Sequence, residues 1–136
     1  MSVRGLFIIL LCVSTTVSAR DDCHHSETTV AMNQCLEQAF DKAETSMQRY
    51  LSASLKRYEN NDEVFNSIHS AQHAWQRYRK HHCESLYSIW IEGTIRGPLT
   101  WRCLITETQK RRHQLWDSYL RFMDNSKPVL PEPQRP

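Results

Sequence analysis

The sequence predicts an all-α fold: a three-helix antiparallel bundle with two long helices, stapled by disulfides and followed by a flexible proline-rich C-terminal tail. Apolar residues recur with the 3.6-residue period of a helix from about residue 30 onward. Strand-like alternation and internal repeats are absent, and helix breakers are rare before the C-terminal prolines. With 136 residues, the chain is long enough for one domain with one core.

The first helix is expected to run from about residue 30 to residue 58. Its apolar stripe consists of Met32, Leu36, Ala39, Ala43, Met47, Tyr50 and Tyr58. Thr28 or Thr29 can cap its start with a side-chain oxygen. The polar residues 59–62 are typical of a turn, in which Asn61 or Asp62 can cap the second helix.

The second helix is expected to end at the loop of residues 93–98, after a stripe of Val64, Ile68, Ala71, Trp75, Tyr78, His82, Leu86 and Ile89. The third helix is expected to begin at Pro98 or just after it. Its inner face would carry Trp101, Leu104, Ile105, Thr108, Leu115, Tyr119 and Phe122. The proline-rich residues 125–136 cannot continue a helix, so they predict an extended, disordered tail.

The N-terminal residues 1–19 have the features of a secretory signal peptide. Arg4 supplies a positive start, residues 6–13 form an apolar run, and Val17-Ser18-Ala19 offers a cleavage site. The run is too short for a membrane span, which needs roughly 20 apolar residues. We therefore expect a periplasmic or secreted protein without a membrane span, with a mature chain from Arg20 and a helical domain over residues 20–124.

Export favours disulfides among the cysteines. Loss of Cys12 with the signal peptide leaves an even number, and oxidising compartments pair exposed thiols. If the first two helices fold back at Asn60-Asn61, Cys35 lies opposite Cys83, and Cys23 and Cys103 come to the same end. We prefer the pairs Cys35–Cys83 and Cys23–Cys103, although Cys23–Cys83 with Cys35–Cys103 is nearly as plausible.

Charge and motifs exclude several classes of function. The chain carries 17 Lys and Arg against 15 Asp and Glu, without the basic clustering that nucleic acids or anionic membranes require. No serine lies in a nucleophile elbow and no phosphate-binding loop is present. Glu84 and Glu92 lie on one helix without a catalytic spacing. The sequence therefore predicts a binding protein rather than an enzyme, without a cofactor and without a nucleic-acid partner.

Segments along the chain resemble, in order, the LprI-type lysozyme-inhibitor domain family. Residues 71–83 (AQHAWQRYRKHHC) are the most specific of them. Residues 29–35 (TVAMNQC) and 43–50 (AETSMQRY) resemble the opening helix, and residues 103–115 resemble the closing helix. The chain departs from the family pattern at Lys80, where an acidic residue is usual, at Met47-Gln48, and in a loop with fewer glycines.

The resemblance implies an exported helical module that binds lysozyme or another cell-wall hydrolase. It also implies structural roles for the residues that match family motifs: Gln72, Trp75, Tyr78, Arg79, Thr108 and Arg111. The two arginines are expected to be buried or half-buried and to bond helix-end carbonyls or a carboxylate such as Glu44 or Glu84. Binding of a partner's carboxylate is the alternative, and Trp75, Tyr78 and Tyr50 are expected in the core.

Residues around the loop of residues 93–98 are the candidates for partner contacts. Arg96 is flanked by glycines, so its side chain could enter the lysozyme cleft, where two carboxylates attract a cation. Trp90 and Trp101 flank the loop and are candidates for exposed contacts. The acidic turn of residues 59–63 is a further candidate. The simpler interpretation of the 93–98 loop is a plain connection between helices, and that of the acidic turn is a helix cap.

Two histidine pairs next to cysteines suggest metal ligands: His24-His25 and His81-His82. A zinc or copper site needs three or four converging ligands, however, and adjacent histidines on a helix point about 100° apart. His82 also lies on the apolar stripe and is expected to pack there. We predict no metal site.

Two alternative functions remain. One is a periplasmic zinc- or copper-binding protein, and the other is an envelope structural or stress factor that has an unrelated partner.

Overall fold

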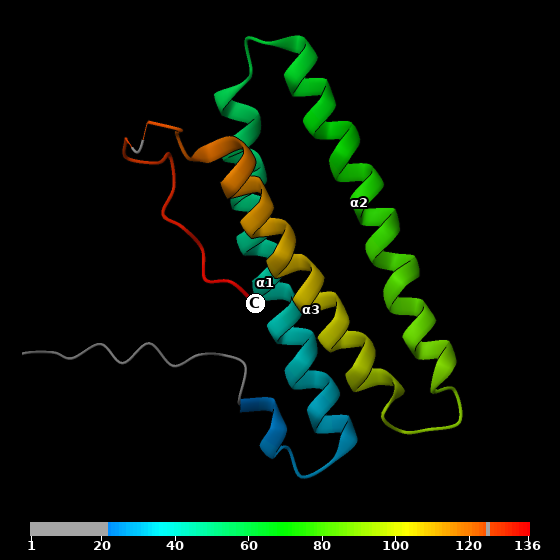
Figure 1. Cartoon of the computed structure of the whole chain (residues 1–136). Coiled ribbons are helices and arrows are strands. Elements are labelled where there is room, and N and C mark those ends of the chain that lie inside the picture. The colour runs from blue at the N-terminus through cyan, green and yellow to red at the C-terminus, as the bar shows by residue number, and fades with distance from the viewer. Residues whose placement is uncertain (1–21, 125) are drawn as a thin grey trace, which may run out of the picture.

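The computed structural model describes residues 22–124 and 126–136 (Figure 1). Its helices are α1 (Thr29–Arg57), α2 (Asp62–Ile89) and α3 (Arg96–Leu115), with a short 3-10 helix η1 (Asp22–His25) before them and a π-helical turn η2 (Trp116–Leu120) after them. The described residues contain no strand. The prediction of an all-α, three-helix bundle with two long helices is therefore confirmed, while the predicted signal peptide, residues 1–19, lies outside the described residues.

Side-chain caps begin the two long helices. The Thr28 hydroxyl accepts a hydrogen bond from the backbone N–H of Ala31 at 3.1 Å, and the Asn61 side chain accepts one from Val64 N–H at 3.2 Å. Each cap satisfies a backbone donor that the first helical turn leaves free. Both caps are among those expected from the sequence. None of the described helices is apolar over a length that would cross a membrane.

Helix α3 is the central element of the bundle. It runs alongside α1 and also packs on α2, whereas α1 and α2 are joined at residues 58–61 and diverge from there (Figure 1). Gly97 permits close packing at the start of α3, because a Cβ atom there would lie 2.6 Å from the Asn33 side chain of α1. The position of α3 between the other two helices decides where the core and the disulfides lie.

The core consists of two clusters. The larger one contains Met47, Tyr50, Leu51, Ile68, Leu115, Trp116 and Leu120. The second, near η1, contains Cys23, Leu36, Ala43 and Ile105. Burial of each fully covered aliphatic side chain, such as Leu115 or Leu120, stabilises the fold by roughly 1.5–3 kcal/mol.

The disulfides join Cys23 to Cys35 and Cys83 to Cys103, each with a Cα–Cα distance of 5.6 Å. The preferred pairs Cys35–Cys83 and Cys23–Cys103 are wrong, and so is the alternative of Cys23–Cys83 with Cys35–Cys103. Those pairs assumed that α1 and α2 stay side by side away from their turn. Because the two helices diverge and α3 packs between them, each cysteine instead bonds to the cysteine that is next to it in chain order.

The C-terminal segment also differs from its prediction. Residues 126–136 are extended, as expected, but they lie against α1, α3 and η2 rather than forming a free tail (Figure 1). Val129 N–H donates to the Leu120 carbonyl at 2.9 Å, and Pro133 is buried. The expectation of a disordered tail came from its lack of helix-forming residues, but side chains of the folded domain supply the hydrogen bonds that the segment cannot form internally.

Candidate partner-binding surface

Arg79 links all three helices through partly buried hydrogen bonds. Its Nη1 donates to Glu44 Oε2 of α1 at 2.5 Å and to Thr108 Oγ1 of α3 at 2.6 Å. The side chains of Arg79 and Glu44 are only 13% and 27% exposed. This is the carboxylate contact expected for Arg79 from the sequence. Since its guanidinium is engaged inside the bundle, Arg79 is not available to a partner's carboxylate.

The second motif arginine, Arg111, extends this polar layer. Its Nε donates to Gln72 Oε1 at 3.0 Å, and the Gln72 amide contacts Met47 Sδ at 3.5 Å. Trp75 lies beneath both guanidinium groups, with Arg79 Cζ at 4.6 Å and Arg111 Cζ at 5.9 Å from the ring centroid. Burial lowers the pKa of Arg111 through desolvation. The partner of Arg111 is therefore a side-chain amide rather than the expected helix-end carbonyl or carboxylate.

Two residues predicted in the core lie on the surface. Tyr78 is 54% exposed, and it stacks on the exposed His82 with ring centroids 5.4 Å apart. The buried residues of α2 are Ile68, Gln72 and Cys83. Because α2 packs mainly on α3, it buries a narrower stripe than its apolar periodicity suggests. The expectations that Tyr78 is a core aromatic and that His82 packs in the core are therefore wrong.

Arg96 is not the exposed loop tip that its flanking glycines suggested. It is the first residue of α3 and is half-buried. Its Nη1 donates to the Ile91 carbonyl, and its guanidinium lies 5.4 Å from the Tyr87 ring centroid. These contacts brace the loop between α2 and α3, so the group is occupied within the chain.

The two tryptophans that flank this loop have different surroundings. Trp101 is half-buried, and its ring packs on Phe40 with centroids 5.6 Å apart. Trp90 is 50% exposed at the C-terminal cap of α2. Of these two tryptophans, Trp90 is therefore the more exposed.

Trp90 belongs to an exposed apolar surface that we call the apolar end surface. Its members lie at the end of α2 and in the following loop: Tyr87 (40% exposed), Ile89 (68%), Trp90 (50%), Ile91 (48%) and Ile95 (49%). The sequence identified only Trp90 and assigned Ile89 to the core. The sequence signal for these exposed residues was the run Ile89-Trp90-Ile91 directly before a loop. At the end of a helix, fewer neighbouring helices are present to cover apolar side chains. Exposed apolar residues that form a contiguous patch are typical of interaction sites, so these residues are the candidates for partner contacts.

The acidic turn of residues 59–63 has local partners instead. Glu59 forms an ion pair with Lys56 at 2.6 Å, and Asn61 caps α2. The turn has the contacts of a helix connection, which was the simpler interpretation.

The histidine pairs considered as metal ligands, His24-His25 and His81-His82, do not form a metal cluster. His24 contacts the Arg102 guanidinium at 3.0 Å, His81 lies 3.5 Å from Glu84, and all four described cysteines are in disulfides. Across residues 22–124 and 126–136, no group of three or more His, Cys, Asp or Glu side chains converges on a point. His69 and His73, which the sequence did not single out, stack on the outside of α2 with centroids 6.5 Å apart.

A shallow depression of about 480 Å³ lies along α1 and is lined by Asp41, Lys42, Thr45, Ser46 and Arg49. Its lining comes from one helix and does not enclose a ligand, unlike the usual small-molecule site.

The chain was compared with protein families, curated proteins and solved structures. The model of the family described as "Lysozyme inhibitor LprI" matches residues 19–115. No curated protein and no solved structure matches the chain significantly. The matched residues include α1, α2, α3 and both disulfides, and they end where η2 begins.

Proposed function

The chain belongs to the lysozyme inhibitor LprI family, and on that premise we propose that it is an exported inhibitor of a lysozyme-type cell-wall hydrolase. The observation that carries the proposal is the apolar end surface on a disulfide-bonded domain. The protein acts by binding its target and has no catalytic role of its own.

The composition of the apolar end surface suits a protein partner. Aromatic residues are enriched at the centres of protein interfaces, and tryptophan and tyrosine often supply most of the binding energy. Trp90 and Tyr87 are such residues, and isoleucines surround them. We expect Trp90 to be the central contact.

The support beneath this surface is rigid, which lowers the entropy lost on binding. The Cys83–Cys103 disulfide ties the last turns of α2 to the first turns of α3, and Arg96 braces the loop from within. A preformed apolar projection of this kind can block a carbohydrate-binding cleft without contacting its catalytic carboxylates. The mode of inhibition that we propose is therefore steric, and it differs from the insertion of Arg96.

Two observations support export. Residues 1–19 have signal-peptide features, and the four described cysteines form two disulfides, which persist in oxidising compartments. The periplasm and the exterior of the cell are both such compartments, and cell-wall hydrolases act there.

Inhibition assays test the proposal. We expect the purified, oxidised protein to inhibit a c-type or a g-type lysozyme acting on cell-wall substrate. Trp90→Ala should weaken inhibition at least tenfold, since a central aromatic contact is worth about 2 kcal/mol or more. Val30→Ala is the control, because Val30 is an exposed apolar residue (67%) at the start of α1, outside the apolar end surface.

The outcomes separate the function from the surface. Inhibition by the unaltered protein that Trp90→Ala leaves unchanged would reject the apolar end surface and keep the function. Absence of inhibition of both enzyme types at micromolar excess of folded protein would reject the function for those enzymes.

A further inference from the structure

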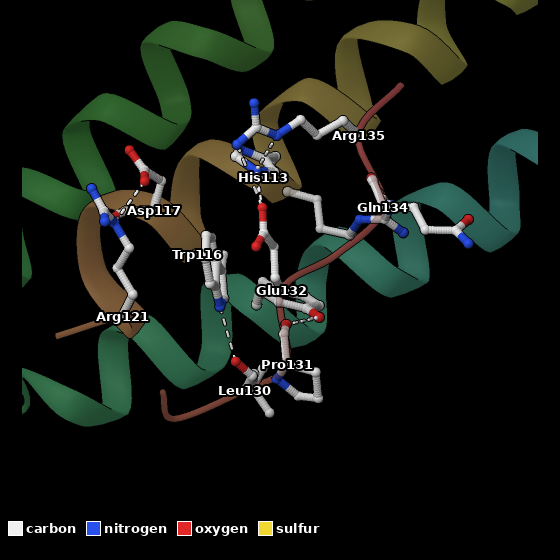
Figure 2. Close-up of polar contacts among 11 residues, drawn as sticks. His113, Trp116, Asp117, Arg121, Leu130, Pro131, Glu132, Gln134 and Arg135 are labelled. Carbon is white, nitrogen blue, oxygen red and sulfur yellow. Dashed lines mark hydrogen bonds and ion pairs between the residues drawn. The ribbon is translucent and has the colours of Figure 1, made fainter. Parts of the chain in front are cut away.

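The C-terminal segment lies on a face that five side chains of the domain form. We call this the tail-binding face: Ser46 and Tyr50 of α1, Arg112 and His113 of α3, and Trp116 of η2. Figure 2 shows the segment running past His113 and Trp116, with the Trp116 indole directed at Leu130. The face and the apolar end surface share no residue.

The domain recognises the backbone of the segment. Trp116 Nε1 donates to the Leu130 carbonyl at 2.9 Å, and the Tyr50 hydroxyl donates to the Pro131 carbonyl at 2.8 Å. Further along, Arg112 Nη2 donates to the Gln134 carbonyl at 2.9 Å. Three side-chain donors therefore meet three main-chain acceptors along an extended chain.

Extended proline-rich peptides are recognised in this way in general. They form no internal hydrogen bonds, so their carbonyls remain free, and aromatic side chains on a protein surface accommodate them. Prolines stand at positions 128, 131, 133 and 136, and Pro133 is buried. The segment has the composition and the contacts of such a ligand.

The donors of the face are held in place by the domain. Tyr50 and Trp116 are only 7% and 9% exposed, and both belong to the larger core cluster. Arg112 Nη1 also donates to Ser46 Oγ at 3.1 Å, which orients its guanidinium. Preorganised donors of this kind lower the entropy that a bound peptide must offset.

Polar contacts to the side chains of the segment are fewer and more exposed, whereas the Leu130 side chain packs on the larger core cluster. His113 lies 3.2 Å from Glu132, a side chain that is 49% exposed, and Arg135 Nε contacts His113 Nε2 at 3.2 Å (Figure 2). Exposed ion pairs add little to affinity. The polar contacts of the face thus select for an extended backbone rather than for particular charged side chains.

We propose that the tail-binding face is a binding site for extended, proline-containing peptides, and that the chain's own C-terminal segment occupies it as a tethered ligand. Such a tether supplies an effective concentration on the order of millimolar. A free peptide therefore competes only at high concentration, or after the segment has been cut or released. The family match ends at residue 115, so Trp116 and the segment itself lie beyond it.

A nicked full-length chain tests this proposal. A protease recognition sequence is inserted between Asp124 and Lys127, the protein is folded and oxidised, and it is then cut. A fluorescent peptide with the sequence of residues 127–136 is added, and its anisotropy is measured. We expect saturable binding, or displacement of the retained native segment by excess peptide.

Two matched changes define the site. A peptide with Pro131→Ala and Pro133→Ala should bind at least tenfold more weakly, and this change leaves the domain untouched. Trp116→Phe keeps an aromatic ring but removes the indole donor, so we expect about tenfold weaker binding of the unaltered peptide. Circular dichroism shows whether that variant is folded.

Either of two results would overturn the proposal. One is a nicked, folded protein that has released its segment and binds no peptide. The other is equal binding of the native and the double-alanine peptides, since proline would then have no part in recognition.

Discussion

The apolar end surface and the tail-binding face both bring aromatic residues to the outside of the helices, yet only one of them is covered. Trp116 is 9% exposed, belongs to the larger core cluster, and donates its indole hydrogen bond to the C-terminal segment. Trp90 is 50% exposed, and no segment of the described chain covers it in a comparable way. The same residue type thus serves intramolecular packing at one place and remains available to another protein at the other.

The difference follows from what lies within reach of each surface. Residues 126–136 return along α1 and α3, so they cover the face that these helices share (Figure 1). The loop between α2 and α3 lies at the opposite end of α2 from the 58–61 turn, the same end of the bundle as η1 (Figure 1). Exposed apolar residues on this rigid end are therefore the ones that we assign to partner binding.

The largest expected effect separates the two surfaces by stability. Leu120 is fully buried in the core cluster next to the tail-binding face, and its carbonyl accepts from Val129 of the segment, whereas Ile89 is 68% exposed in the apolar end surface. Leu120→Ala should lower the free energy of unfolding by about 2–5 kcal/mol, because it leaves a cavity. Ile89→Ala should change it by no more than about 0.5 kcal/mol. Chemical denaturation of both variants checks this, and equal losses would contradict the contrast.

The disulfides should divide the two surfaces by function. In the chain-entropy model, replacing either pair by serines costs about 3 kcal/mol, because the closed loops have similar lengths. Only the Cys83→Ser/Cys103→Ser variant removes the support of the apolar end surface. We therefore expect it to weaken lysozyme inhibition more than Cys23→Ser/Cys35→Ser does, in assays where both variants are folded. The reverse order would argue against a contact at this end.

The smallest expected effect concerns the ion pair in the tail-binding face. Glu132 is 49% exposed, and the pair that it forms with His113 is accessible to water and salt. Glu132→Gln should change the free energy of unfolding by less than about 0.5 kcal/mol. A thermal or urea denaturation curve measures it. A loss several times larger would mean that side-chain contacts, rather than carbonyl recognition, hold the segment.

Sequence patterns were most informative where neighbours along the chain decide the structure. Thr28 and Asn61 as caps, the 58–61 turn and the helical stripes follow from local hydrogen bonding and periodicity. The Arg79–Glu44 contact could be expected because a half-buried guanidinium needs a partner. The same patterns failed for His82 and Ile89, because periodicity shows which side of a helix is apolar and not how far its neighbour extends.

By itself, the sequence determined the all-α class, the number and approximate ends of the helices, and the membership of the LprI family. The physical basis of the helix assignments is local, since caps, turns and periodicity need no knowledge of distant residues. Tertiary structure decided the rest: which cysteines meet, that Arg96 braces the loop, and that the proline-rich segment is bound. Each of these depends on α3 packing between two helices that diverge, and on hydrogen bonds between groups as far apart in the chain as Tyr50 and Pro131. Such long-range placement leaves no periodic signal in the sequence.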